Sequence, residues 1–167
     1  MITLEPITQQ NAMIYKDVRL RALQDTPSAF GSTYARESQF TDADWIKRAT
    51  QRSGERSAGY IAIDGSIPCG IVGGFLDQEN STRAHLVSMW VAPSYRRLGI
   101  GRSLVNAILE WAYKQRACTL QLMVTGNNDS AIRFYQSLGF KMTGRTEPYP
   151  NDSALIEYEM SRSIKSE

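Results

Sequence analysis

The 167-residue sequence contains one histidine and two cysteines, and this scarcity excludes several kinds of site. Cys69 and Cys118 are too few for a disulfide framework, and they form no C-x-x-C pair. With His85 added, a zinc site built from cysteine and histidine has three ligands in the whole chain, one fewer than a structural site needs. We therefore predict no metal site, and reduced thiols in a cytoplasmic protein.

Charge of one sign and long apolar runs are absent as well. The chain has 19 basic and 17 acidic residues, a net charge of +2, which does not favour a nucleic-acid partner. No apolar run approaches the roughly 18 residues of a membrane-spanning helix, so no membrane partner is expected. The first ten residues lack the basic and apolar regions of a secretory signal. Without repeats or linker-like tracts, residues 1–167 are predicted to form a single domain.

Hydrophobic periodicity and turn residues predict an alternation of strands and helices. The expected order, by residue range, is strand 2–7, helix 11–24, a weaker helix 28–40, a helix 41–52, strands 59–64, 68–76 and 82–91, a helix from 101 to about 116, strand 118–124, helix 128–138, and strands 140–147 and 154–160. Asp64-Gly65 indicates a hairpin turn, and Gly139 is a residue that commonly ends a helix. The sequence therefore predicts one mixed α/β domain.

The most informative segment joins the third central strand to the helix that follows it. Gly99 and Gly101 allow the backbone to approach a ligand closely, and the first N–H groups of a helix attract anions. Arg96, Arg97 and Arg102 add positive charge to the same loop. Leucine at position 104 breaks the dinucleotide-binding pattern G-x-G-x-x-G. On spacing alone, the choice is between a phosphate-binding loop and a tight turn that merely requires glycine.

Two motifs together resemble one known family. Residues 91–104, VAPSYRRLGIGRSL, are similar to the acetyl-coenzyme A loop of the GNAT N-acetyltransferase superfamily, whose signature Gln/Arg-x-x-Gly-x-Gly/Ala is met by Arg96, Gly99 and Gly101. Residues 128–140, NDSAIRFYQSLGF, resemble a second motif of the family and follow at the expected distance. The resemblance implies an α/β (α+β) GNAT fold, with a mixed, mostly antiparallel sheet of about seven strands flanked by helices.

The resemblance also implies a cofactor, acetyl-CoA or free coenzyme A, and the residues that bind it. Backbone groups of one strand would pair with the pantetheine arm, and amides of the loop would bind the pyrophosphate. In the second motif, one side chain would hydrogen-bond the pantetheine and the other would contact the leaving thiolate. These residues are Met89, Trp90 and Val91 on the strand, Arg96, Arg97, Leu98, Gly99, Ile100, Gly101 and Arg102 in the loop, and Asn128 and Tyr135 in the second motif. The Tyr135 hydroxyl would protonate the leaving thiolate, although Tyr135 could instead be a packed core aromatic.

His85 is the candidate general base, because it lies eleven residues before Arg96, where histone-type members carry a catalytic glutamate. Imidazole is a suitable base near neutral pH. Strand alternation places His85 on the same face as Met89 and Val91, provided that no bulge intervenes. The alternative is a strand histidine bonded to a neighbour. Three carboxylates are rival bases: Glu37, Glu147 and Glu157.

The acceptor would lie opposite the cofactor, between the first helices and the loop that joins the last two strands. In this family those regions imply a set of aromatic and acidic contacts, Phe30, Tyr34, Glu37, Tyr149 and Asp152. Aromatics with carboxylates suit a cationic amine, while solvated charges and a packed aromatic edge are the alternative reading of each residue.

The predicted reaction is transfer of acetyl from acetyl-CoA to a primary amine by direct attack in a ternary complex. No covalent enzyme intermediate is expected, because neither cysteine lies at the cofactor motif. N–H groups near Met89 would polarise the thioester carbonyl. A small-molecule acceptor is favoured, because the chain has no basic tail or docking segment. A protein N-terminus or lysine, a non-catalytic acyl-CoA-binding module, and a dinucleotide-binding protein are the alternatives, and a homodimer stays open.

Overall fold

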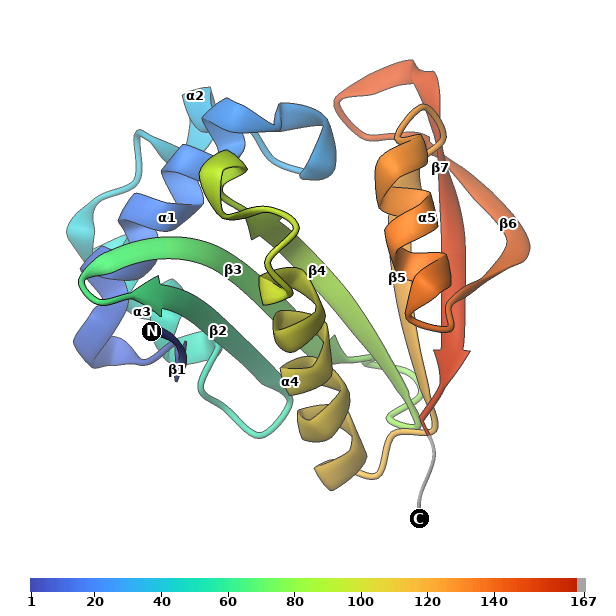
Figure 1. Cartoon of the computed structure of the whole chain (residues 1–167), viewed down its shortest axis with the longest axis horizontal. Coiled ribbons are helices and arrows are strands. Elements are labelled where there is room, and N and C mark those ends of the chain that lie inside the picture. Colours follow the sequence, from blue (N-terminus) through green and yellow to red (C-terminus); the bar gives the residue numbers. More distant parts are fainter. Residues whose placement is uncertain (165–167) are drawn as a thin grey trace.

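The computed structural model describes residues 1–164 and centres on one seven-stranded sheet (Figure 1). The strands are β1 (Ile2–Pro6), β2 (Ser57–Asp64), β3 (Ile67–Leu76), β4 (Arg83–Val91), β5 (Thr119–Thr125), β6 (Lys141–Tyr149) and β7 (Asp152–Ser163). Their spatial order is β1-β2-β3-β4-β5-β7-β6. Every neighbouring pair is antiparallel except β4 and β5, which run parallel. The expectation of a mixed, mostly antiparallel sheet is therefore confirmed.

Helices cover both faces of the sheet. They are α1 (Ala12–Asp25), α2 (Tyr34–Glu37), α3 (Asp42–Gln51), α4 (Ile100–Lys114) and α5 (Asp129–Ser137). Figure 1 shows α4 and α5 together in front of the sheet, with α1 and α3 behind it. Neighbouring glycines of β3 face opposite sides: a Cβ atom on Gly74 would touch Ile108 of α4, and one on Gly73 would touch Arg52, which follows α3. The two faces are called below the α4–α5 face and the α1–α3 face.

Local sequence signals place most helix ends correctly. Thr41 accepts a hydrogen bond from the Asp44 amide at 3.1 Å, and Asp44 accepts one from the Thr41 amide at 2.9 Å, so α3 begins with a capping box. Gly139, with φ +91°, ends α5 in the left-handed conformation that glycine adopts most easily.

The expected helix over residues 28–40 is wrong. A short 3₁₀ turn, Pro27–Ala29, and the single-turn α2 are separated by extended backbone around Phe30. The Phe30 carbonyl oxygen accepts hydrogen bonds from the Tyr149 hydroxyl and from Asn151 Nδ2, both on the distant β6–β7 hairpin. These long-range bonds replace those of a helix. The hairpin also differs from expectation, because its strands reach Tyr149 and Asp152 and leave a shorter turn.

The sheet opens between β4 and β5. Their pairing stops at His85 and Gln121, although both strands continue beyond these residues, and the two ribbons move apart toward the end of β4 (Figure 1). On its other edge β4 contains a bulge: Val87 pairs with Gly73, but Trp90 already pairs with Ile71. Ser88 occupies the bulge with a φ of +58°, in the left-handed region.

The bulge overturns the predicted alternation along β4. His85 pairs with Phe75 and Val87 pairs with Gly73, so both face the α1–α3 side. Beyond the bulge, the Met89 side chain contacts the position of a Gly101 Cβ atom and therefore faces α4 and α5. His85 and Met89 thus lie on opposite faces, because the extra residue inverts the two-residue period.

No helix within residues 1–164 is long and apolar enough to cross a membrane.

Candidate active site

A buried ion-pair network holds the bulge of β4 from the α1–α3 face. Arg19 of α1 donates two hydrogen bonds of 3.0 Å to the Glu37 carboxylate and one of 2.9 Å to Ser88 Oγ. Arg48 of α3 donates a further bond of 2.8 Å to Glu37. Burial alone would raise the pKa of Glu37, but the bonds and charges of the two arginines bring it down to about 2. Glu37 is thus an ionised structural partner and a weak proton acceptor.

The loop before α4 presents a run of unpaired backbone donors. Gly99 has φ +84°, and a Cβ atom there would meet nothing within 4 Å, so its surroundings are open. The first backbone bond of α4 joins the Ser103 amide to the Gly99 carbonyl at 3.1 Å. Within residues 1–164, the N–H groups of residues 97–102 have no protein acceptor. Consecutive free N–H groups at a helix N-terminus form an anion-binding site.

Arg96 anchors this loop. Its Nε donates to the Val91 carbonyl at 2.9 Å, and its Nη2 donates to Asp25 Oδ2 at 2.8 Å. The same Asp25 oxygen accepts a 2.9 Å bond from Trp90 Nε1. The Arg96 guanidinium is therefore engaged by protein groups, and the charge left free on the loop belongs to the exposed Arg97 and Arg102.

Gly101 has a different task from Gly99. A Cβ atom at Gly101 would lie 3.0 Å from the Phe134 ring and 3.1 Å from the Met89 methyl group. A glycine at this position therefore lets α4, α5 and β4 pack closely at the point where β4 and β5 part.

The second motif forms the start and the core-facing side of α5. Asn128 caps the helix, because its Oδ1 accepts from the Ala131 amide at 3.1 Å, and its Nδ2 is left to donate elsewhere. The Tyr135 ring is buried between Phe134 and Phe140, at centroid distances of 5.2 and 5.7 Å. Its hydroxyl has no hydrogen-bond partner among the described residues. Burial raises the pKa of Tyr135 well above its usual range, so the phenol keeps its proton at neutral pH.

His85 lies on the α1–α3 face and is held by two neighbours. Its Nε2 lies 2.9 Å from Asp77 Oδ2, and its ring stacks on Phe75 at a centroid distance of 4.8 Å. The bond from His85, with backbone bonds to the same carboxylate, lowers the pKa of Asp77 to about 2. Because Asp77 is ionised, Nε2 is the donor, and Nδ1 is the nitrogen left to accept a proton.

The rival carboxylates Glu147 and Glu157 lie across the opening from β4. Parallel pairing places Gln121 on the same face as His85, and Thr125, four residues on, shares that face. Thr125 pairs with Glu157, which in turn pairs with Glu147, so both carboxylates lie on the α1–α3 face. Burial, with the nearby charge of Glu147, raises the pKa of Glu157. This carboxylate is thus a stronger base than Glu37.

The structure brings together three of the expected acceptor contacts and separates the others. Phe30, Glu37 and Tyr149 are buried side by side: the Arg19 guanidinium that binds Glu37 lies 4.8 Å above the Phe30 ring. Tyr34 lies with the outward-facing residues of α1, on the surface. Asp152 is exposed, and its Oδ1 accepts from the Ala154 amide at 3.0 Å in the hairpin turn.

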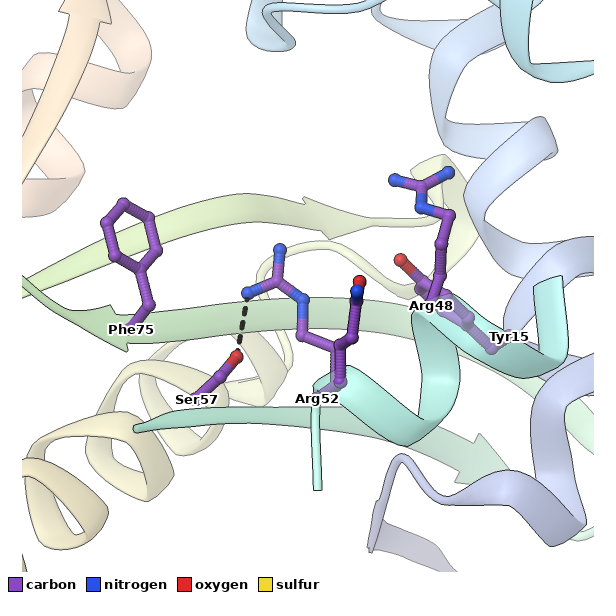
Figure 2. Close-up of a pocket in the computed structure, with 6 residues that line it drawn as sticks. Tyr15, Arg48, Arg52, Ser57 and Phe75 are labelled. Carbon is purple, nitrogen blue, oxygen red and sulfur yellow. Dashed lines mark hydrogen bonds between the residues drawn. The ribbon is translucent and has the colours of Figure 1, made fainter. Parts of the chain in front are cut away.

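Sequence reasoning missed a cavity on the α1–α3 face. It has a volume of about 270 Å³ and is lined by Tyr15, Arg48, Gln51, Arg52, Ser57 and Phe75 (Figure 2). The region that contains Arg52 reads as a polar loop, QRSGERS, from the sequence. Nothing in it signals that Arg52 folds back over Gly73 of β3, because that contact depends on how α3 packs on the sheet.

Comparisons with known proteins agree with this geometry. Residues 19–140 match the acetyltransferase (GNAT) family. The chain belongs to that family. Acetyltransferases of this family use acetyl-CoA as the acyl donor, which agrees with the predicted enzyme class and cofactor. The predicted fold is confirmed by a GNAT-family acetyltransferase of Streptococcus pneumoniae, which superposes with a TM-score of 0.82 at 20% identity, over 99% of this chain and 100% of that one.

Two further proteins are similar to this family member. The structure of yncA from Salmonella typhimurium, solved with its cofactor acetyl-CoA, has a TM-score of 0.79 at 14% identity, over 100% of this chain and 96% of that one. The [ribosomal protein bS18]-alanine N-acetyltransferase of Escherichia coli is 40% identical over 68 residues, which are 40% of this chain and 46% of that protein. The chain spans about half the length of the curated relatives it matches.

Proposed function

We propose that this family member transfers the acetyl group of acetyl-CoA to a primary amine, by direct attack of the amine on the thioester in a ternary complex. One observation carries the proposal: β4 and β5 part next to a helix N-terminus that presents unpaired N–H groups. The parted strands leave backbone groups available to a pantetheine arm, as an added strand would use them. The free N–H groups fit the pyrophosphate of the same ligand.

The residues present fit coenzyme A at each of its parts. Backbone groups of Met89, Trp90 and Val91 would hold the pantetheine, and Asn128 Nδ2 would donate to it. The amides of residues 97–102 would bind the pyrophosphate, with charge from Arg97 and Arg102. Because its guanidinium is bound by Asp25 and Val91, Arg96 contributes by fixing the loop.

When bound, acetyl-CoA supplies an activated acyl group as a thioester. The bulge leaves Ser88 and Met89 without paired residues on β3, and an N–H group at this point would polarise the thioester carbonyl. The Tyr135 hydroxyl would donate its proton to the departing sulfur. Because burial raises the pKa of Tyr135, the hydroxyl still carries this proton at neutral pH. Tyr135 thus acts as the general acid.

His85 is the proposed general base, with Glu157 as the second candidate. Asp77 orients the imidazole through Nε2, so Nδ1 would take a proton from the incoming amine, directly or through water. Glu157 faces the same side of the sheet from β7 and is the alternative proton acceptor. The two differ in the pH dependence that they give to the reaction.

A small-molecule acceptor is favoured because hydrogen bonds join two segments on the side of the protein where the acceptor would bind. The Tyr149 hydroxyl donates to the Pro27 carbonyl at 3.0 Å, and Asn151 Nδ2 donates to the Ser32 carbonyl at 3.3 Å. These bonds tie the β6–β7 hairpin to the segment between α1 and α2 and restrict the path of a polypeptide. A protein N-terminus is the second candidate, because the relative from Escherichia coli acts on the alanine of a ribosomal protein.

The test is an acetylation assay on purified protein with acetyl-CoA and a panel of amines, peptides with free N-termini and lysine peptides. Released coenzyme A is measured with a thiol reagent, and acetylated products are identified by mass spectrometry. Acetylated small amines support the proposal. If only the peptides are acetylated, the acceptor is a protein and not a small molecule. If coenzyme A binds but no acetylated product forms, the protein is a non-catalytic acyl-CoA-binding module.

A further inference from the structure

The cavity on the α1–α3 face contains positive charge that the protein does not neutralise. Arg52 Nη1 donates to Ser57 Oγ at 3.3 Å, and no carboxylate within residues 1–164 lies within 4.0 Å of its guanidinium. Its neighbours Arg19 and Arg48 share one carboxylate, that of Glu37. Three guanidinium groups therefore meet a single negative charge.

Contacts with neighbouring side chains fix the direction in which the arginine side chains enter the cavity. In Figure 2, the side chains of Arg52, Arg48 and Phe75 rise on the same side of the β3 ribbon, with the space of the cavity between them. Arg48 lies over the Trp45 and Phe40 rings, at 4.9 and 5.3 Å, so aromatic contacts and the Glu37 bond fix its direction. The Arg52 guanidinium beside it is half-buried and therefore poorly solvated, and this burial lowers the pKa of Arg52.

The cavity adjoins the proposed reaction centre. The Arg52 guanidinium lies against Gly73, whose partner on β4 is Val87, the residue before the bulge. Strands in a sheet lie about 4.8 Å apart, so the guanidinium is roughly one strand spacing from β4 and two from the opening between β4 and β5. A ligand whose anionic end binds Arg52 can therefore place a second group, about 5–10 Å from that end, at the opening between β4 and β5.

We propose that this cavity binds an anionic group of the acetyl acceptor, a carboxylate or a phosphate, so that the substrate is an amine that carries this group several bonds from its nitrogen. The inference rests on the proposed acetyl transfer and names its substrate class. The planar guanidinium of Arg52 matches carboxylate and phosphate geometry, and Arg48 lies beside it. The amine end then points toward the side of the sheet that carries Glu157.

Matched pairs of amines test the inference on the wild-type enzyme. 6-Aminohexanoate is compared with 6-aminohexanamide, and 4-aminobutyl phosphate with 4-aminobutanol, by kcat/KM from coenzyme A release. We expect the anionic member of at least one pair to be at least ten-fold better, and the pair with the larger ratio identifies carboxylate or phosphate. Equal values within both pairs overturn the inference.

Arg52→Gln locates the effect. We expect the ratio between anionic and neutral amines to fall at least ten-fold in this variant. Arg36→Gln removes an exposed arginine of α2 and is expected to keep the wild-type ratio. Circular dichroism and melting temperature establish that both variants fold. A ratio unchanged by Arg52→Gln overturns the inference, and if that variant does not fold, the wild-type ratios still decide.

Binding separates failure of this inference from failure of the proposed function. If no amine is acetylated, the proposed reaction is wrong, and inorganic phosphate and 6-acetamidohexanoate are titrated into the wild type and Arg52→Gln by calorimetry. Binding of either probe that is lost in the variant supports an anion site. Absent binding, or equal binding by both proteins, overturns it.

Discussion

Arg19 Nη1 donates a 2.9 Å hydrogen bond to Ser88 Oγ, and this bond joins helix α1 to the bulge of β4 across 69 positions of sequence. The same guanidinium binds Glu37 through its other nitrogens. The backbone conformation of Ser88, where the strand face inverts, is therefore tied to a buried ion pair. We infer that the network positions the backbone proposed to polarise the thioester.

Ser88→Ala is expected to reduce activity because the backbone of the β4 bulge is no longer held in place by Arg19. Loss of the hydroxyl leaves Arg19 Nη1 without its acceptor, which costs about 1–2 kcal/mol of stability for a buried donor. We expect kcat to fall several-fold while KM for acetyl-CoA changes less than two-fold, measured by steady-state kinetics. Ser163→Ala, at an exposed position near the end of β7, is the matched control. A loss that appears only in KM would contradict a role for the bulge in the chemical step.

Glu37→Gln is expected to change the stability of the protein and its dependence on pH. The pKa of Glu37 is about 2 in the folded protein, against an ordinary 4.5. The unfolded state therefore binds more protons between these values, and the free energy of unfolding falls as pH drops from 4.5 toward 2. At ~1.4 kcal/mol per pKa unit, ionised Glu37 contributes about 3 kcal/mol above this window.

Urea denaturation at pH 7 and pH 3 measures this contribution. The variant is expected to lose about 3–5 kcal/mol at pH 7, because Arg19 keeps a buried charge without its partner, and to lose less than the wild type on acidification. Glu110→Gln, on the exposed side of α4, is expected to stay within about 0.5 kcal/mol of the wild type. Equal acid sensitivity in wild type and Glu37→Gln would refute the assignment.

Tyr135→Phe is expected to lower kcat by about 100-fold or more, the usual scale of general acid catalysis, with KM for acetyl-CoA nearly unchanged. The hydroxyl has no partner among residues 1–164, so stability should hardly change. Tyr113→Phe removes a hydroxyl from an exposed position on α4 and serves as the control. Full activity in Tyr135→Phe would eliminate the general-acid role.

The pH profile of kcat/KM distinguishes the two candidate bases. If His85 accepts the proton, His85→Gln lowers turnover and removes the acidic limb of the profile, while Glu157→Gln keeps it. If Glu157 is the base, the limb disappears in Glu157→Gln. Glu147→Gln then moves it to lower pH, because the charge of Glu147 contributes to the raised pKa of Glu157. An unaltered profile in His85→Gln with normal activity would remove His85 from the mechanism.

Local signals explain why much of the fold could be predicted. Thr41 and Asp44 cap α3, Gly139 ends α5, and Leu104 and Ile108 line the buried side of α4, each through contacts within one or two turns. The loop before α4 was equally readable, because Gly99 and its neighbours act through their own backbone. The helix expected around Phe30 failed because bonds from the β6–β7 hairpin determine that segment.

The sequence by itself determined most of the order of strands and helices and the position of the glycine-containing turn before α4, since periodicity, caps and glycines act on neighbouring residues. Only the tertiary structure decided that Ser88 forms a bulge, that His85 and Met89 face opposite sides, and that Glu37 is a buried ion-pair partner. It also decided that Arg52 lines a cavity. These features depend on the pairing and packing of segments far apart in the chain, which no local pattern encodes.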